Sequence, residues 1–206
     1  MRNKIFVMFL LLSTYVSASQ LNEAQQASER GDYKKAVEIL EPLAKAGDVD
    51  ALGNLGNMYA FGQGVPQDLT KAAELWKKAA DKGLGTAMGN LAKLYSEGLG
   101  GLPKDQKLAA QWFKKAAEHR HAPSMIQLSV LYHDGKVLDK NLVEAIAWSG
   151  LTATNTNNPA LKNAAIKQIK QWGSEASPEQ MSEAQKRSDE LVKIIDINVR
   201  KYKSGT

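Results

Sequence analysis

The sequence contains no cysteine among its 206 residues. Without thiols the chain forms neither disulfides nor thiolate metal sites, so its fold depends on packing alone. Histidine is also scarce, and none of the three copies stands in a metal-ligand or nucleophile pattern. His119 and His121 are two positions apart, so on a helix their side chains face different directions. We therefore expect no metal, no cofactor and no catalytic residue.

The sequence also has only a small excess of charge of one sign. The chain has 27 basic and 22 acidic residues, a formal net charge of +5. Nucleic-acid binding normally requires a dense basic stripe, and none is present. The only strong local excess of basic residues is at residues 200–203, which we interpret as part of a solvated basic tail. No nucleic-acid partner is expected.

Long hydrophobic runs are limited to one, at the N-terminus. Arg2 and Lys4 are followed by an apolar run at residues 5–12 and by small residues at 16–18. This order is typical of a secretory signal peptide, and the run is shorter than the roughly 20 residues that cross a bilayer. An uncleaved anchor helix is the alternative. We predict that residues 1–18 are removed, which leaves a periplasmic or secreted protein without stable membrane insertion.

What the sequence does contain is a repeated helical pattern. Alanine, leucine, lysine, glutamate and glutamine are plentiful, a balance that favours helix. A leucine and a tyrosine four positions apart recur with spacings of 36 and 37 residues, at Leu55/Tyr59, Leu91/Tyr95 and Leu128/Tyr132. Such a period is typical of helical solenoids, and residues four apart share one helix face, which we predict to be buried. The small residue between each pair would let a second helix approach closely; these residues are Gly56, Ala92 and Ser129.

Each copy of the pattern then predicts a turn and a second helix. A glycine three positions after the tyrosine ends the first helix in a positive-φ conformation, at Gly62, Gly98 and Gly135. The second helix begins after a residue whose side chain caps free amide groups, namely Asp68, Asp105 or Asn141. The glycines follow a helix rather than a strand, which argues against a phosphate-binding loop. Each copy is therefore predicted to be a pair of antiparallel helices.

These residues carry a resemblance to a known family. The stretch from Ala51 to Gly83 resembles the Sel1-like repeat, a relative of the tetratricopeptide repeat, through Leu55-Gly56, Met58-Tyr59, Gly62, Gly64-Val65, Asp68 and Trp76-Lys77-Lys78-Ala79-Ala80. The copy at 87–117 is close, whereas the copy at 124–153 departs more, with one turn glycine and no final lysine pair. The resemblance implies an all-α fold, a right-handed superhelical solenoid of antiparallel helix pairs that is capped at both ends.

This interpretation divides the chain into six segments. They are a signal peptide at 1–18, an N-terminal capping helical hairpin at 19–48, Sel1-like repeats at 49–84, 85–121 and 122–157, and C-terminal capping helices with the basic tail at 158–206. A separate C-terminal domain is the alternative, although about 50 residues make a poor independent core.

The resemblance also implies a binding surface. In such solenoids the first helix of each pair lines a concave face. Taking the leucines and tyrosines as anchors, we predict that the partner-binding residues are Gln25, Ser28, Asn57, Ala60, Lys93, Ser96, Ile126, Val130 and His133. The set is polar at one end and apolar at the other, which suits a protein or peptide partner with an apolar anchor near Val130. The alternative occupant of this groove is the chain's own segment 185–206.

These features favour a periplasmic adaptor that binds a protein or peptide partner and is not an enzyme. Exported Sel1-like proteins include envelope assembly factors and immunity proteins that neutralise toxic effectors. The resemblance therefore implies a toxin effector or an envelope complex subunit as the partner. The alternative is an enzyme or enzyme modulator that acts on the cell wall or on β-lactams, although this chain lacks the cysteines of the relatives linked to β-lactams.

Overall fold

The computed structural model describes residues 17–204, all helices and connecting turns without a strand. The predicted signal peptide at 1–18 lies almost wholly outside this range. The contacts divide the chain into two compact units, Met1–Ala79 and Ala80–Thr206. Within residues 17–204, no helix is both long and apolar enough to cross a membrane.

The first unit begins with a helical hairpin. A helix at residues 17–29 is followed by α2 (Tyr33–Lys45), and an ion pair of 2.7 Å joins Lys35 Nζ to Glu23 Oε1 across the two. The turn between them closes through the N–H of Asp32, which donates to the carbonyl of Ala27 at 2.9 Å. The hairpin leads into the first pair of repeat helices, α3 (Val49–Phe61) and α4 (Leu69–Asp81).

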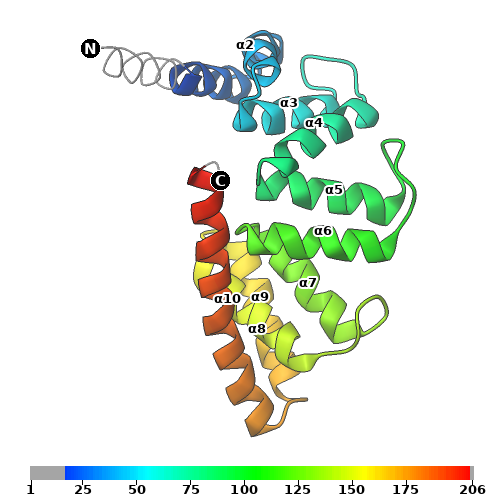
Figure 1. Ribbon diagram of the computed structural model, residues 1–206, viewed down its shortest axis with the longest axis vertical. Coiled ribbons are helices and arrows are strands. Elements are labelled where there is room, and N and C mark those ends of the chain that lie inside the picture. Colours follow the sequence, from blue (N-terminus) through cyan, green and yellow to red (C-terminus); the bar gives the residue numbers. More distant parts are fainter. Residues whose placement is uncertain (1–16, 205–206) are drawn as a thin grey trace. The chain divides into compact units, whose positions relative to one another are not determined.

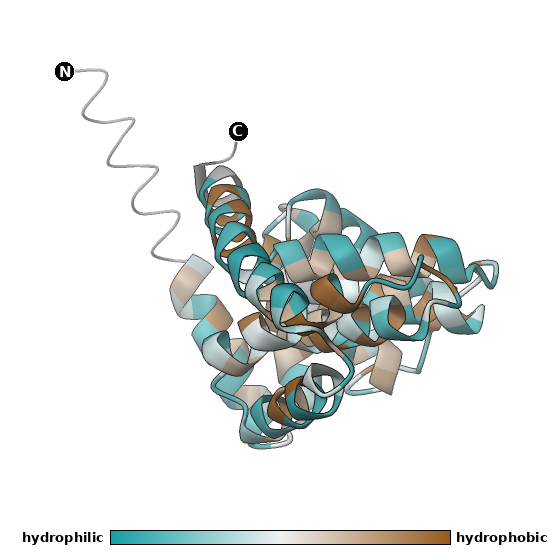
Figure 2. Ribbon diagram, turned by 90° about the horizontal axis from the view of Figure 1, so that it is seen from below, coloured by the Kyte–Doolittle hydropathy of each residue, from teal (hydrophilic) through white to brown (hydrophobic). Residues whose placement is uncertain are grey.

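The second unit is a run of helices in which each packs on the next (Figure 1). Consecutive contacts connect α5 (Gly85–Glu97), α6 (Gln106–Glu118), α7 (Ala122–Asp134), α8 (Leu142–Asn155) and α9 (Pro159–Gly173). The last helix, α10 (Pro178–Ser204), packs along α8 and also reaches α6. Hydrophobic and hydrophilic stretches alternate along the helices, as expected of amphipathic elements with one buried face (Figure 2).

The predicted turn chemistry is confirmed in all three repeats. The turn glycines adopt left-handed φ angles of 67°, 73° and 67° at Gly62, Gly98 and Gly135. Each capping side chain accepts an N–H from the third residue beyond it, at 2.8 Å for Asp68, 2.9 Å for Asp105 and 3.0 Å for Asn141. The N–H of the same capping residue donates to the carbonyl of the repeat's tyrosine, at 2.9, 2.8 and 2.9 Å for Tyr59, Tyr95 and Tyr132. One residue therefore starts the second helix and ties it to the end of the first.

The prediction for the leucine and tyrosine face is correct for the leucines only. Leu55, Leu91 and Leu128 are at most 5% exposed, whereas the three tyrosines are half-buried. Each tyrosine lies in the last turn of the first helix, beside the loop, where its side chain is only partly covered. The leucines lie one turn earlier on each helix and are more completely buried than the tyrosines.

The small residue between leucine and tyrosine does allow a close approach. A Cβ atom added at Gly56 would lie 2.6 Å from Nε1 of Trp76 on α4. The equivalent residues Ala92 and Ser129 are fully buried in the second unit. The close contact between the helices of a pair therefore depends on a small side chain at this position.

This contact predicts opposite effects for two helical glycines. We expect Gly56→Ala to lower the free energy of unfolding by about 1–3 kcal/mol, because the new methyl group overlaps the Trp76 ring. Gly150→Ala is the matched control, since its Cβ would meet only Ser188 Oγ at 3.8 Å. There the gain in helix propensity should raise the free energy of unfolding by up to about 1 kcal/mol. Urea denaturation followed by circular dichroism measures both, and effects of the same sign would contradict the packing described.

The C-terminal helices close the second unit. Leu191 and Ile195 of α10 are buried in a cluster with Leu128, Trp148 and Leu151. Ser177 begins α10 as a cap: its Oγ accepts the N–H of Gln180 at 3.2 Å, and its own N–H donates to the Gln180 side chain at 2.9 Å. The backbone at residues 200–203 is helical, because α10 continues to Ser204, and the Arg200 side chain is exposed.

Candidate protein-binding site

The predicted site residues of the first unit are largely engaged by their own surroundings. Gln25 is exposed and donates to Glu29 Oε1 at 3.0 Å, and the Ser28 hydroxyl donates to the carbonyl of Ala24 at 3.0 Å. Asn57 is half-buried, and its Oδ1 accepts the indole N–H of Trp76 at 3.2 Å. The prediction that Ala60 contacts a partner is wrong, because its methyl group is buried at 5% exposure.

In the second unit, Lys93 and Ser96 lie together at the rim of a hollow that we call the α5–α7 pocket. Its volume is about 470 Å³. One wall is formed by α5, the opposite wall by α7 with its capping residue, and the floor by α6. The lining residues are Lys93, Ser96 and Glu97 of α5, then Gln106, Ala109, Ala110 and Phe113 of α6, then His121, Pro123, Ser124, Gln127 and Leu131 at α7.

The pocket combines an apolar floor with a polar rim. Phe113 is 8% exposed and lies beside two buried alanines, and Leu131 adds a half-buried side chain on the α7 side. Two rim groups are bonded within the protein: the Ser96 hydroxyl donates to the carbonyl of Lys93 at 2.8 Å, and Gln106 Nε2 donates to the carbonyl of Ser96 at 2.7 Å. An apolar base with a few oriented polar groups is the usual composition of a binding pocket.

Of the ten lining residues that the sequence did not predict, four lie on α6 and four on α7. Pro123, Gln127 and Leu131 are spaced by four, so they form one row on the helix facing the pocket. That spacing is visible in the sequence. The prediction aligned the repeats on their leucines and tyrosines and assumed that every first helix presents the same face to a partner. It therefore chose the neighbouring row of α7.

The predicted partner-binding residues of the third repeat form that neighbouring row and do not line the pocket; they are Ile126, Val130 and His133. Val130 packs against a buried cluster that includes Trp172 of α9. The His133 ring stacks on the Trp172 ring, with centroids 4.5 Å apart and an interplanar angle of 14°. Ile126 is half-buried. This face of α7 packs against α9, the first helix of the next pair, whereas the other face of α7 lines the pocket opposite α5.

His121 is the most perturbed group in the pocket. Burial, and then the positive charge of Lys93, lower the pKa of the imidazole to about 4. The ring lies against Gly89, where an added Cβ would be only 2.4 Å from it, so glycine at this position allows His121 to sit between α5 and α7. His121 is therefore neutral near pH 7.

The pairing of His121 with Ser124 has the distance of a catalytic dyad but not its chemistry. The imidazole Nδ1 lies 2.7 Å from the Ser124 hydroxyl oxygen. A general base works best when its pKa lies near the working pH, and a pKa of about 4 makes this imidazole a weak one. Ser124 is also only 1% exposed, so its hydroxyl is covered from a substrate. The arrangement fits a structural hydrogen bond beneath a binding surface.

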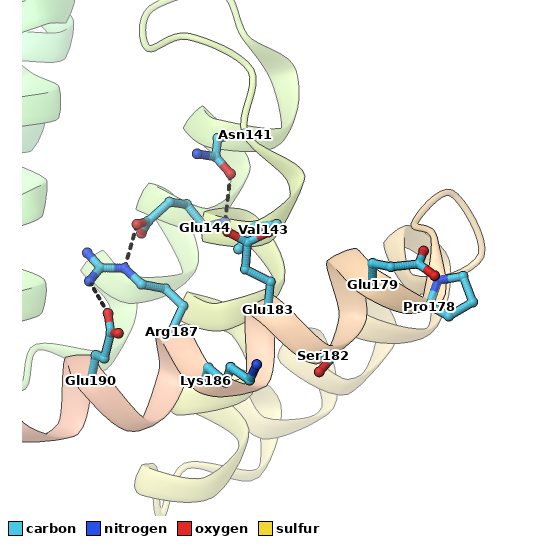
Figure 3. Close-up of a pocket in the computed structure, with 10 residues that line it drawn as sticks. All are labelled: Asn141, Val143, Glu144, Pro178, Glu179, Ser182, Glu183, Lys186, Arg187 and Glu190. Carbon is cyan, nitrogen blue, oxygen red and sulfur yellow. Dashed lines mark hydrogen bonds and ion pairs between the residues drawn. The ribbon is translucent and has the colours of Figure 1, made fainter.

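A second hollow lies between the start of α8 and α10, with a volume of about 1040 Å³ (Figure 3). Arg187 crosses it, donating to Glu144 Oε1 at 2.6 Å and to Glu190 Oε2 at 3.0 Å. The other Glu144 oxygen accepts the indole N–H of Trp148 at 3.1 Å. Burial, followed by the charge of Glu144, raises the pKa of the nearby Tyr132 hydroxyl.

The bonds in this second hollow join α10 to α8, so its central charges already have partners within the protein. Lys93 and Glu97 at the rim of the α5–α7 pocket differ in this respect: among the described side chains neither forms an ion pair. The α5–α7 pocket also has no lining residue from α10. The sequence-based alternative, in which segment 185–206 fills the partner groove, therefore does not describe this pocket.

Comparison with known proteins identifies the family. The Sel1 repeat model matches residues 24–48, 49–84, 85–121 and 122–155. These segments make up more than half of the chain, which therefore belongs to the Sel1 repeat family. Sel1 repeats generally mediate protein–protein interactions, and proteins built from them are typically scaffolds without enzymatic activity.

Solved structures agree with the fold. A Sel1 repeat protein from Oxalobacter formigenes is 27% identical, with a TM-score of 0.66, over 73% of this chain and 57% of the other. A protective antigen present in uropathogenic Escherichia coli strains, which displays an SLR fold, is 22% identical, with a TM-score of 0.59, over 91% of this chain and 48% of the other. The chain thus spans about half the length of these two proteins. No curated protein matches it. The fold class is all-α, a helical solenoid of the Sel1-like type.

Proposed function

We propose that the chain is a non-enzymatic periplasmic adaptor that binds a segment of a partner protein in the α5–α7 pocket. The observation that carries the proposal is the pocket itself. It lies between α5 and α7, the first helices of two consecutive repeats, and Phe113 and Leu131 give it an apolar surface. Its rim carries Lys93 and Glu97, which form no ion pair among the described side chains. An apolar centre with a polar rim is the usual anatomy of a protein interface.

Two roles fit this adaptor, and the identity of the partner separates them. In the first, the chain is an immunity protein that neutralises a secreted toxic effector. In the second, it is an assembly factor that holds a subunit of an envelope complex. Both are supported by the family's role in protein–protein interaction. A captured toxin would establish the first role, and a captured structural subunit of the envelope would establish the second.

The periplasmic part of the proposal has its own test. Cell fractionation should recover the protein in the periplasm or the medium, and mass spectrometry should show that it begins at Ser19. This follows from the basic, apolar and small-residue order of residues 1–18. A cytoplasmic protein that retains these residues would contradict it.

The binding surface is tested with a charged substitution on the exposed α7 row. We expect Gln127→Arg to weaken capture of the protein partner from a periplasmic extract at least about tenfold, because a bulky cation would occupy the pocket. Gln171→Arg on α9 is the matched control, since Gln171 is also exposed but lines no part of the pocket. Equal capture by both variants would show that the partner binds elsewhere.

A further inference from the structure

The charges at the rim of the α5–α7 pocket have a defined order and spacing. Lys93 and Glu97 stand four residues apart on α5, one helical turn, and both line the hollow. At 1.5 Å per residue their attachment points are separated by about 6 Å along the helix axis. In an extended chain, alternate side chains lie on the same face and repeat every 6.6 Å or so. The two spacings agree within about 1 Å.

The Lys93 charge acts within the pocket as well as at its edge. Its positive charge is the second cause, after burial, of the lowered pKa of His121, which lines the same hollow. Since neither Lys93 nor Glu97 has an ion-pair partner among the described side chains, both charges are available to a bound molecule. Charge complementarity at an interface governs which partner is accepted and in which register.

We propose that the pocket selects an extended protein segment that carries one acidic and one basic side chain two positions apart. The acidic side chain pairs with Lys93, and the basic side chain pairs with Glu97. The residue between them faces α7, where Leu131 offers an apolar contact and Gln127 offers an amide for the peptide backbone. This inference rests on the proposed function and names the chemistry of the partner.

Single charge reversals test the inference without requiring the natural partner. A displayed library of random linear peptides is selected against the purified mature chain and against two variants, Lys93→Glu and Glu97→Lys. Wild type should enrich opposite charges at positions i and i+2. Lys93→Glu presents two carboxylates and should enrich two basic residues, whereas Glu97→Lys presents two ammonium groups and should enrich two acidic residues. Each selected peptide should bind the mismatched variants at least about tenfold more weakly, a difference of about 1.4 kcal/mol.

The Gln127→Arg variant separates failure of this inference from failure of the proposed function. If wild type enriches peptides that Gln127→Arg does not bind, but the charge pattern is absent or is the same for both reversal variants, the inference is wrong and the pocket remains a peptide site. If no peptide is enriched over Gln127→Arg, both proposals are wrong. Both reversed positions are exposed, so thermal melting should be unchanged and binding differences should reflect the pocket.

Discussion

Trp148→Ala is expected to lower the free energy of unfolding by about 3–5 kcal/mol, the largest effect of any substitution considered. The Trp148 side chain is 1% exposed and lies in the cluster that receives Leu191 and Ile195 of α10. Its removal would leave a cavity at the contact between α8 and α10. It would also remove the indole N–H donor from Glu144, which holds Arg187.

A matched aromatic control is available at Phe61. This side chain is 71% exposed, so Phe61→Ala should change the free energy of unfolding by no more than about 0.5 kcal/mol. Urea denaturation monitored by circular dichroism compares the two variants directly. If Trp148→Ala unfolds at the same urea concentration as Phe61→Ala, α10 is not held by the cluster described.

The stability of the protein is expected to fall by about 2 kcal/mol between about pH 7 and about pH 4.5 because of His121 alone. The pKa of this imidazole is about 4 in the folded chain, against its ordinary value of 6.5. Between these two values the unfolded chain binds more protons than the folded chain. Acid therefore favours unfolding, and the stabilisation present above pH 6.5 is progressively lost as the pH falls toward 4.

The variant His121→Gln isolates this contribution, because carboxylates also titrate in the same range. Wild type and variant are unfolded with urea at both pH values. The stability difference in favour of wild type should shrink by about 2 kcal/mol at the lower pH. An NMR titration of the His121 ring gives an independent check. If the difference between the two proteins is the same at both pH values, His121 titrates normally and is not buried as described.

The elements of this fold that sequence reasoning predicts best are those decided by neighbouring residues. The turn glycine at 98 and the cap at Asp105 act within a few positions of themselves, so their residue types alone indicate a helix end and a helix start. The same holds for Ser177 at the start of α10. The segments that match the Sel1 repeat include the turn glycine at 98 and the cap at Asp105, whereas Ser177 lies beyond them.

The candidate site is harder to predict because it depends on how each helix is rotated against its neighbours. Lys93, a predicted partner-binding residue, lies at the rim of the hollow between α5 and α7. The same repeat position in α7 is Val130, but there α9 follows and brings Trp172 against it. Only the contact between distant helices distinguishes the two cases, and the repeat pattern treats them as equal.

The stacking of Trp172 on His133 bears on how such an array changes length by gene duplication. A pair of helices inserted after α8 would separate these two rings and expose apolar surface on both, so it would need new residues at each junction. A pair inserted between α6 and α7 would keep the Trp172–His133 stack, but it would separate His121 from Gly89 and α10 from α6. Lengthening at either place therefore requires new residues at the junction, and only insertion ahead of α7 keeps α7 through α10 together.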